Sequence, residues 1–234
     1  MTAGTLYGVG LGPGDPDLIT RKAARLIENA AIIAYPTLAG GESFARAIAA
    51  DLIAADAREI VMDVPMTLAR EPAQAAYDKG AAEIASVLNS GEDVVCLCEG
   101  DPFFYGSFMY LHARLGGRFT VEVVPGVTSL TACAAQAGVP LVARNERLTV
   151  LPGPLPADEL TRRIEGAESV AVLKVGRHLP KLRSVIAGLG LLNRAVYVER
   201  ATLPEERICP LADAPDEAPY FSMILLAKGA DPWL

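Results

Sequence analysis

The sequence predicts an α/β protein of two domains, the first with a mainly parallel sheet and the second with a mixed sheet. Short apolar runs of the kind that form buried strands alternate with segments of helical periodicity along the 234 residues. Glycine turns follow some of these runs, as at Gly10 and Gly100. Pro125-Gly126 interrupts the alternation and provides a natural hinge. We therefore expect domains at residues 1–124 and 125–234, with an active-site cleft between them.

In the first domain, the strands and helices can be placed from apolar spacing and capping residues. Asp15 can cap a helix that has Pro16 at its first position, and the apolar residues from Ile19 to Ile27 continue it. Gly91 is a stop signal for a long helix. The expected strands are 6–11, 31–35, 59–64, 93–98 and 119–124, and the other expected helices are 43–54, 72–90 and 105–115. This alternation implies a mainly parallel sheet covered on both faces.

The second domain begins with an expected helix at 128–137 that ends at Gly138. Its last two strands, near Arg207 and Phe221, have no helix between them, and a hairpin there would make the sheet mixed. Residues 204–219 are rich in proline and acids and are expected to form a surface loop. The other expected strands are 148–151, 170–175 and 195–199, the last strand covers 221–227, and helices fall at 157–164 and 179–189.

Composition excludes several classes of function. The formal net charge is −7 and the sequence pI is about 5.0, whereas nucleic-acid-binding proteins usually present a basic surface. The sequence has no apolar run long enough to span a membrane and no charged-then-apolar leader. We therefore expect a soluble cytoplasmic protein with no nucleic-acid or membrane partner.

Cysteine and histidine spacing gives no sign of a metal site. Cys96 and Cys98 alternate along one expected strand and so share a face. They form Cys-x-Cys, and no second pair supplies metal-ligand spacing. With only two histidines in the chain, we expect buried apolar thiols and no metal.

The segment from Cys98 to Phe108 carries the strongest chemical signal. A Gly100-Asp101-Pro102 turn follows an apolar strand, at the sheet edge where open α/β folds bind their ligands. Gly100 permits close approach of a ligand to the backbone, and the Asp101 carboxylate can hold a cationic group. The alternative interpretation is a tight strand-to-helix turn with an N-capping aspartate.

Three further segments complete a pattern that resembles the tetrapyrrole methylase family over essentially the whole chain. They are residues 7–20 around Gly8-x-Gly10-x-Gly12, residues 123–129 with Pro125-Gly126, and residues 172–177. The family uses S-adenosylmethionine and has a fold unrelated to the common Rossmann-like methyltransferases. Four segments resemble one group of enzymes within this family, namely Glu99–Phe108, Leu151-Pro152-Gly153, Lys174–Lys181 and Tyr197–Arg200. These favour methylation of precorrin-2 at C-20 in cobalamin biosynthesis, which yields precorrin-3A and S-adenosylhomocysteine.

The resemblance also implies roles for individual residues and a homodimeric assembly. Glu99 and Tyr105 are the candidate catalytic residues, with His178 as a further candidate base. The implied substrate-binding residues are Gly10, Gly12, Tyr35, Lys174, Arg177 and His178, the last three in a basic run that includes Lys181 and Arg183. The implied cofactor-binding residues are Pro13, Glu99, Gly100, Asp101, Pro102, Phe104, Thr128, Ser129, Val175, Ala201 and Leu225.

Alternatives to these assignments remain open. Gly8-x-Gly10-x-Gly12 is not taken as a dinucleotide site, because Pro13 interrupts the turn and Asp15 and Asp17 would repel a pyrophosphate. These glycines could instead only permit close packing against the second domain, and the basic run could be a solvated helix start. Tyr35-Pro36 stands where uroporphyrinogen methylases carry an aspartate, so that base is missing here. The rival functions are methylation of cobalt-precorrin-2, another family activity such as that of diphthine synthase, and ligand binding without catalysis.

Overall fold

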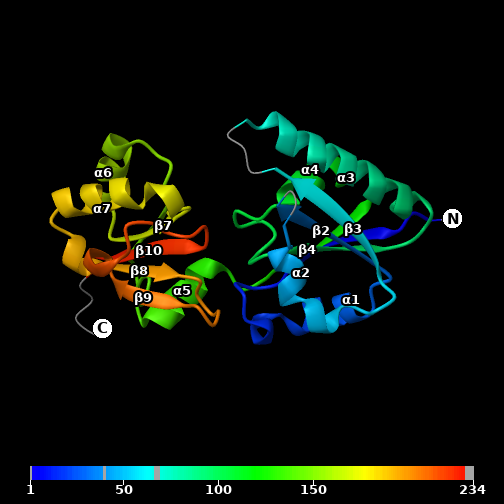
Figure 1. The fold of residues 1–234 in the computed structure, drawn as a ribbon, viewed down its shortest axis with the longest axis horizontal. Coiled ribbons are helices and arrows are strands. Elements are labelled where there is room, and N and C mark those ends of the chain that lie inside the picture. The colour runs from blue at the N-terminus through cyan, green and yellow to red at the C-terminus, as the bar shows by residue number, and fades with distance from the viewer. Residues whose placement is uncertain (1, 39–40, 66–68, 230–234) are drawn as a thin grey trace. The chain divides into compact units, whose positions relative to one another are not determined.

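The structure is a computed structural model, and it describes residues 2–38, 41–65 and 69–229. The chain divides into two compact units, Met1–Thr128 and Ser129–Leu234 (Figure 1). The division falls between the last strand of the first sheet, which ends at Val124, and helix α5 (Ser129–Ala137). Pro125-Gly126 lies in this connecting segment.

Unit 1 contains a five-stranded sheet in which every strand pair is parallel, as the alternating pattern predicts. The strand order is β3-β2-β4-β1-β5, so β1 lies between β4 and β5, and Tyr7 faces Val95 on one side and Glu122 on the other. The strands are β1 (Thr5–Gly10), β2 (Ile32–Leu38), β3 (Arg58–Val64), β4 (Val94–Cys98) and β5 (Thr120–Val124).

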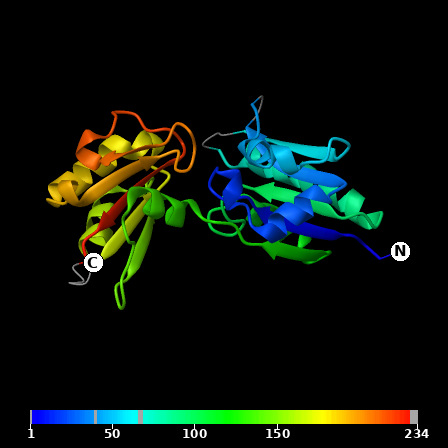
Figure 2. The same cartoon turned by 90° about the horizontal axis from the view of Figure 1, so that it is seen from below.

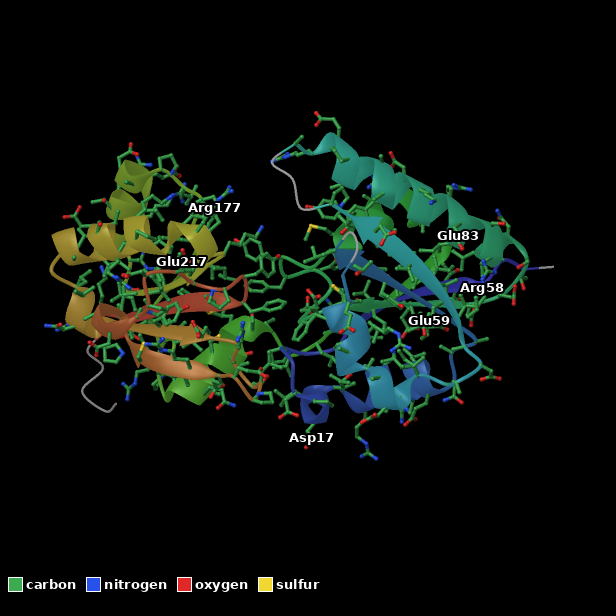
Figure 3. The ribbon with its side chains drawn as sticks, viewed as in Figure 1. Asp17, Arg58, Glu59, Glu83, Arg177 and Glu217 are labelled. Atoms are coloured by element: carbon green, nitrogen blue, oxygen red, sulfur yellow. The ribbon has the colours of Figure 1, made fainter. Side chains whose placement is uncertain are left out.

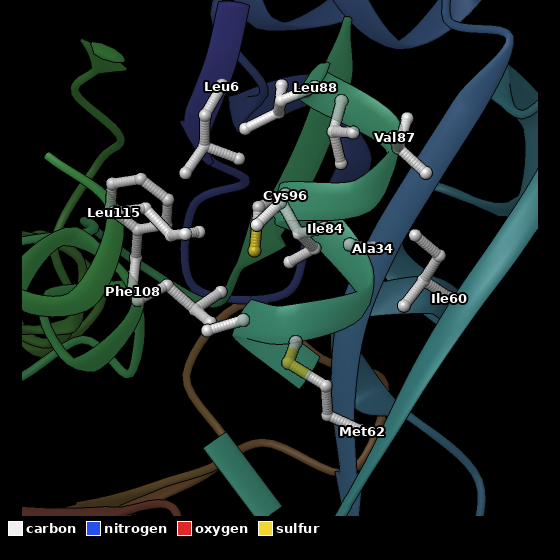
Figure 4. Packing of buried hydrophobic residues seen from close by; sticks show 14 of the residues in the cluster. Leu6, Ala34, Ile60, Met62, Ile84, Val87, Leu88, Cys96, Phe108 and Leu115 are labelled. Carbon is white, nitrogen blue, oxygen red and sulfur yellow. The ribbon is translucent and has the colours of Figure 1, made fainter. Parts of the chain in front are cut away.

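The helices of unit 1 cover both faces of this sheet (Figures 1 and 2). They are α1 (Arg21–Glu28), α2 (Phe44–Ile48), α3 (Glu71–Asn89) and α4 (Phe108–Leu115). Strand alternation separates two cores: Cys96 and Cys98 pack with α3 and α4, whereas Val95 and Leu97 pack with α1 and α2. Figure 4 shows the α3 side, where Ile84 and Leu88 cover Cys96.

This arrangement creates a topological switch point between β1 and β4. The chain leaves β1 toward α1 on one face and leaves β4 toward α4 on the other, although the two strands are neighbours. In open α/β sheets, the crevice at such a point is where ligands bind, outside the carboxyl ends of the strands. The loops that follow β1 and β4 begin at Leu11 and Glu99, at this switch point.

Three expected helices of unit 1 differ in the structure. Asp15 caps only a 3₁₀ turn (Pro16–Leu18), and a new helix then begins after Thr20, whose hydroxyl accepts a hydrogen bond from the N–H of Ala23. The expected helix at 43–54 is the short α2 followed by a 3₁₀ turn (Ala50–Leu52). Helix α4 begins at Phe108 and not at residue 105, because Tyr105 has a left-handed backbone with φ of 58°.

Unit 2 contains a mixed five-stranded sheet in the order β6-β7-β10-β8-β9. The mixed character was expected, but the expected hairpin of the last two strands is wrong. β10 inserts between β7 and β8 and is antiparallel to both, while β9 pairs with β8. The strands are β6 (Leu148–Pro152), β7 (Ser169–Leu173), β8 (Ala195–Glu199), β9 (Arg207–Pro210) and β10 (Ser222–Ala227).

Three helices of unit 2 cover its sheet, namely α5 (Ser129–Ala137), α6 (Ala157–Glu165) and α7 (Leu179–Gly188). Ile224 and Leu226 of β10 pack in the core that α6 and α7 cover, and α5 contacts β8 and β10. The segment 204–219 is only in part a surface loop, because it contains β9 and the fully buried Leu211.

The cysteines behave as apolar core residues. Cys96, Cys98 and Cys133 are buried and free, and Cys209 is half-buried. Burial raises the pKa of the Cys133 thiol to about 12, and it raises the pKa values of Cys96 and Cys98 as well. No group of three or more potential metal ligands occurs among the residues that the structure describes. Within the same residues, no helix has the length and apolar character needed to cross a membrane.

Candidate active site

Three loops of unit 1 meet at the carboxyl ends of β4, β1 and β5. The Gly12 N–H donates to the Gly100 carbonyl at 3.2 Å, and the Gly100 N–H donates to the Gly12 carbonyl at 2.7 Å. A Cβ atom on Gly10 would lie 2.5 Å from the Gly126 nitrogen, and one on Gly126 would lie 2.0 Å from the Gly100 carbonyl oxygen. These glycines therefore allow three backbones of the same unit to pack directly against one another.

Gly100 differs from the other glycines of this cluster. Its φ of +63° is a left-handed conformation, and a Cβ built on it would meet no atom within 4 Å. One face of this backbone is thus open, as a close-binding ligand requires. Gly100 lies two residues after the end of β4, at the switch point of the sheet.

Asp101 holds two of the loops together. One carboxylate oxygen accepts hydrogen bonds from the N–H groups of Phe103 and Phe104 at 2.9 and 3.0 Å. The other accepts from the N–H of Gly126 at 3.1 Å. The capping interpretation of Asp101 is therefore present in the structure, with an added link to the loop after β5. A direct contact of Asp101 with a ligand stays a prediction.

The residues after Asp101 place aromatic rings around this loop. Pro102 is buried, Phe104 is half-buried, and Tyr105 is 46% exposed with its ring edge-on to Phe104, at a centroid distance of 5.3 Å. The positive φ of Tyr105 is strained for a bulky residue, and such strain is concentrated at functional sites. Pro13, on the facing loop, is half-buried.

Glu99 is the titratable group next to this cluster. It is half-buried, and the loss of hydration raises the pKa of its carboxyl above the usual range, while a hydrogen bond with the Ala45 backbone opposes the rise. A carboxyl whose pKa is raised by burial, at the switch point of a sheet, is a candidate proton acceptor or donor.

Tyr35 has a different environment from the one expected for a substrate-binding residue. It is 5% exposed and packs in the α1–α2 core, and its hydroxyl donates to Glu59 of β3. Glu59 also accepts two hydrogen bonds of 2.9 Å from the guanidinium of Arg46. Figure 3 shows Glu59 on β3. Tyr35 thus belongs to a structural network, and its predicted substrate contact stays untested.

In unit 2, several predicted residues lie where β7 and β8 end. These strands are parallel to each other because both are antiparallel to β10. Lys174 and Arg177 are exposed (Figure 3 for Arg177), and Lys174 has a left-handed φ of 56°. β7 ends at Leu173, two residues earlier than expected, because Lys174 cannot continue a strand in this conformation.

Only part of the basic run is available to a substrate. Lys181 donates to the Leu155 carbonyl at 2.5 Å, and Arg183 donates to the carbonyls of Ala214 and Pro215 at 2.6 Å. Burial, then Lys181 and Arg177, lower the pKa of His178 below its usual value, which favours the neutral imidazole. Lys174 and Arg177 are the exposed cations of this run.

The remaining predicted cofactor residues are mostly buried. Val175 and Leu225 are fully buried and Ala201 is 7% exposed, so any ligand contact would use their backbones. Thr128 and Ser129 are half-buried at the start of α5, and the N-terminal end of a helix favours an anion. These five assignments stay predictions.

Sequence reasoning missed Tyr220, Phe221 and Arg200, which lie beside the sheet edge at which β7 and β8 end. Tyr220 and Phe221 are 60% and 37% exposed and immediately precede β10, and the N–H of Arg200 donates to the Phe221 carbonyl at 2.8 Å. Two adjacent aromatics directly after the acidic, proline-rich segment gave a signal, but the insertion of β10 between β7 and β8 was needed to place them.

The sequence matches a family model described as tetrapyrrole (corrin/porphyrin) methylases over residues 5–215. The chain belongs to this family. It is 43% identical to the precorrin-2 C(20)-methyltransferase of a Sinorhizobium species over 97% of each chain. It is 32% identical to the cobalt-precorrin-2 C(20)-methyltransferase of Salmonella typhimurium, covering 96% of this chain and 97% of that one.

Solved structures of tetrapyrrole methylases share the fold. Uroporphyrin-III C-methyltransferase from Thermus thermophilus, complexed with S-adenosylhomocysteine, superposes with a TM-score of 0.68 at 26% identity, covering 96% of this chain and 92% of that one. The two-sheet architecture described above is therefore that of a tetrapyrrole methylase.

Proposed function

We propose that this protein transfers a methyl group from S-adenosylmethionine to C-20 of precorrin-2, giving precorrin-3A in cobalamin biosynthesis. The observation that carries the proposal is the open, left-handed Gly100 at the switch point of the unit 1 sheet, in a tetrapyrrole methylase similar to precorrin-2 C(20)-methyltransferase over nearly its whole length. The solved relative with S-adenosylhomocysteine supports the methyl donor.

The residues of unit 1 fit such a donor. The open face of Gly100 permits the backbone to approach a flat or bulky ligand, and Asp101 fixes that loop against Gly126. We propose that the N–H groups at Thr128 and Ser129 hold the donor's carboxylate, since the start of a helix favours an anion. Backbone groups of Val175, Ala201 and Leu225 would complete the contacts from unit 2.

The reaction depends more on alignment of the methyl group with C-20 than on activation of C-20 as a nucleophile. C-20 supplies the electron pair of the new C–C bond, the bond between sulfur and methyl breaks, and its electron pair stays on sulfur as the neutral thioether. A reduced tetrapyrrole is an electron-rich enamine system, so C-20 is already nucleophilic. Holding the carbon and the methyl in line lowers the barrier by about 7–11 kcal/mol.

One proton leaves C-20, and we propose Glu99 as its acceptor. The raised pKa of Glu99 brings its carboxyl toward the range in which proton transfer is efficient near neutral pH. Tyr105, exposed on the same loop, and His178 of unit 2 are the alternative bases. In the ionised state, Glu99 would also stabilise the positive charge of the sulfonium.

We propose that Lys174 and Arg177 bind carboxylates of the substrate. Precorrin-2 carries several acetate and propionate groups, whereas the protein has a net charge of −7, so a local cationic region is needed for encounter. The double variant Lys174→Ala with Arg177→Ala should raise the KM for precorrin-2 more than either single variant. The rise should shrink as salt is added, while the Kd for S-adenosylhomocysteine stays unchanged. A double variant with the wild-type KM and salt response would contradict this assignment.

The cobalt-containing substrate is a second candidate, because a cobalt-precorrin-2 C(20)-methyltransferase is 32% identical to this chain. Incubation of the pure protein with radiolabelled S-adenosylmethionine and either metal-free or cobalt precorrin-2 tests both. Label in a tetrapyrrole at C-20 confirms the reaction and identifies the preferred form. Label in neither substrate would favour another family activity, such as that of diphthine synthase, or ligand binding alone.

We further propose that the protein is a cytoplasmic homodimer. The proposal rests on the methyl donor and the reduced substrate, which are cytoplasmic metabolites, and on the assembly usual for the family that the chain belongs to. Sedimentation equilibrium of the pure protein tests it, with a particle of twice the mass of 24.6 kDa expected.

A further inference from the structure

Tyr220 and Phe221 form an exposed aromatic pair, here called the aromatic platform. Their ring centroids lie 5.1 Å apart at an interplanar angle of 79°, and 60% and 37% of their surfaces are exposed. Large exposed aromatics that contact each other are uncommon on a soluble protein unless they bind something. The platform stands at the point where the chain enters β10.

The backbone beneath the platform is held in place. The Tyr197 hydroxyl, fully buried, lies 3.2 Å from the Ser222 hydroxyl and donates to Glu199 at 2.5 Å. Ser222 in turn donates to the Pro219 carbonyl at 2.8 Å. The residues before β10 are therefore anchored on both sides of the aromatic platform, so its rings are presented on a fixed base.

Basic side chains stand on both sides of the platform. The pairing of β8 with β10, together with the bond from the Arg200 N–H to the Phe221 carbonyl, brings Arg200 next to Phe221. On the other side, β7 pairs with β10 and leads into Lys174 and Arg177. All three side chains are exposed, and Arg177 and Arg200 make no ion pair within the described part of the chain.

Two acids of this edge, Glu199 and Glu206, accept hydrogen bonds from neighbouring groups. Glu199 accepts the Tyr197 hydroxyl, and Glu206 accepts the Thr202 N–H at 2.7 Å. Arg200 and Thr202 both have left-handed backbones, with φ of 50° and 72°, so the turn after β8 carries strain. An exposed apolar surface between unpaired guanidinium groups suits a ligand with an apolar ring and peripheral carboxylates.

We propose that the aromatic platform binds the face of the tetrapyrrole substrate, and that Arg200, opposite Lys174 and Arg177, binds its peripheral carboxylates. This inference rests on the proposed function and adds three residues to it. An extended macrocycle gains apolar burial and ring contacts on Tyr220 and Phe221. Cations on two sides then fix its orientation, which decides which meso carbon faces the methyl donor.

The test uses the double variant Tyr220→Leu with Phe221→Leu, and separately Arg200→Gln, in the full chain. Leucine keeps the apolar character but removes the rings. We expect the platform variant to raise the KM for precorrin-2 about three- to tenfold. Arg200→Gln should raise the KM and weaken its dependence on salt. The Kd for S-adenosylhomocysteine, measured by calorimetric titration, should change less than twofold in both.

Matched controls separate these effects from general damage. Tyr110→Leu removes an exposed aromatic of α4 in unit 1, and Arg162→Gln removes an exposed guanidinium of α6 in unit 2. Both should keep the wild-type KM. A platform variant with the wild-type KM would overturn the inference while leaving the proposed reaction intact. A raised Kd for S-adenosylhomocysteine would assign the platform to the methyl donor instead, and failure of the wild type to methylate either form of precorrin-2 would overturn both proposals.

Discussion

At the scale of single residues, the carboxylate of Asp101 joins two loops of the candidate site. It accepts three backbone hydrogen bonds from two loops, so Asp101→Ala should leave three N–H groups without their acceptor. We expect a loss of about 1–3 kcal/mol in the free energy of unfolding, together with weaker binding of S-adenosylhomocysteine. Asp101→Asn keeps one acceptor oxygen and should lose less. Denaturant unfolding without ligand and calorimetric titration measure the two effects. Unchanged stability with weakened binding would make Asp101 a direct ligand contact.

Replacement of Glu99 by glutamine should have opposite effects on stability and on activity. Its folded-state pKa is raised, so its ionisation destabilises the native protein as the pH rises above the unfolded-state value. Glu99→Gln should therefore raise the Tm at pH 7, with a gain that vanishes well below the unfolded-state pKa of about 4.3, where both states of the wild type are protonated. The same variant should lower kcat with precorrin-2. Thermal unfolding at several pH values and initial rates provide the measurements. A variant with lower stability at pH 7 would contradict the raised pKa.

At the scale of elements, the loops after β1 and β4 offer a matched pair of glycines. Gly10→Ala places a Cβ 2.5 Å from the Gly126 nitrogen, so it should unfold or strongly destabilise unit 1. Gly100→Ala meets no atom, so it should fold and should cost only about 1–2 kcal/mol for its left-handed backbone. It should nevertheless weaken S-adenosylhomocysteine binding, because its methyl projects into the open side. Circular dichroism and calorimetry test this, and Gly100→Ala with wild-type affinity would remove Gly100 from the ligand site.

The network that joins β2, β3 and α2 gives a second prediction at this scale. Tyr35→Phe should cost about 1 kcal/mol of stability, because Glu59 loses one donor but keeps Arg46. The hydrogen bonds from Arg46 and Tyr35 lower the pKa of Glu59, so the stability from this carboxylate is present at neutral pH and is lost as the pH falls through its folded-state value. The KM for precorrin-2 should not change. A raised KM in Tyr35→Phe would restore the predicted substrate role.

At the scale of the whole molecule, the proposed cofactor contacts come from both units. Hydrogen exchange with and without S-adenosylhomocysteine should show slower exchange in the loop at 99–106 of unit 1 and in the segments at 174–177 and 200–203 of unit 2. Ligand binding to the native state alone should also stabilise the protein by about 2.7 kcal/mol at a concentration one hundred times the Kd. Slower exchange confined to unit 1 would mean that this unit holds the ligand by itself.

The sequence predicted the positions of the strands and helices far better than it predicted which strands pair. Apolar runs mark β1, β4 and β8 almost to the residue, because burial of a strand leaves a local signature. The partners of β10 leave none, since the same Ser222–Ala227 run would serve in a hairpin or in the middle of a sheet. Residues at chain reversals were also misplaced: the left-handed backbone of Tyr105 delays the start of α4, and that of Lys174 ends β7 early.

For the candidate site, the glycines in the sequence indicated where backbones pack closely, whereas the basic residues did not indicate which side chains are exposed. Gly10 ends β1, and Gly100 and Gly126 lie within two residues of the ends of β4 and β5, so the carboxyl edge of the parallel sheet brings them together. The sequence indicated close packing at Gly10 but assigned it to the second domain, whereas these glycines pack within unit 1. Lys181 and Arg183 look equivalent to Arg177 in sequence, yet their side chains bind carbonyls of distant segments. Only the packed structure reveals which cations remain accessible.

The central place of β10 has a consequence for synthesis. The sheet of unit 1 uses strands that end at Val124, so all of its partners have been made before unit 2 begins to form. The sheet of unit 2 cannot join β7 to β8 until the final described strand leaves the ribosome, because β10 lies between them. At about 5–20 residues per second, the β8 edge waits for several seconds with unpaired backbone groups. Nascent unit 2, and not unit 1, is therefore the part of this protein that should need a chaperone.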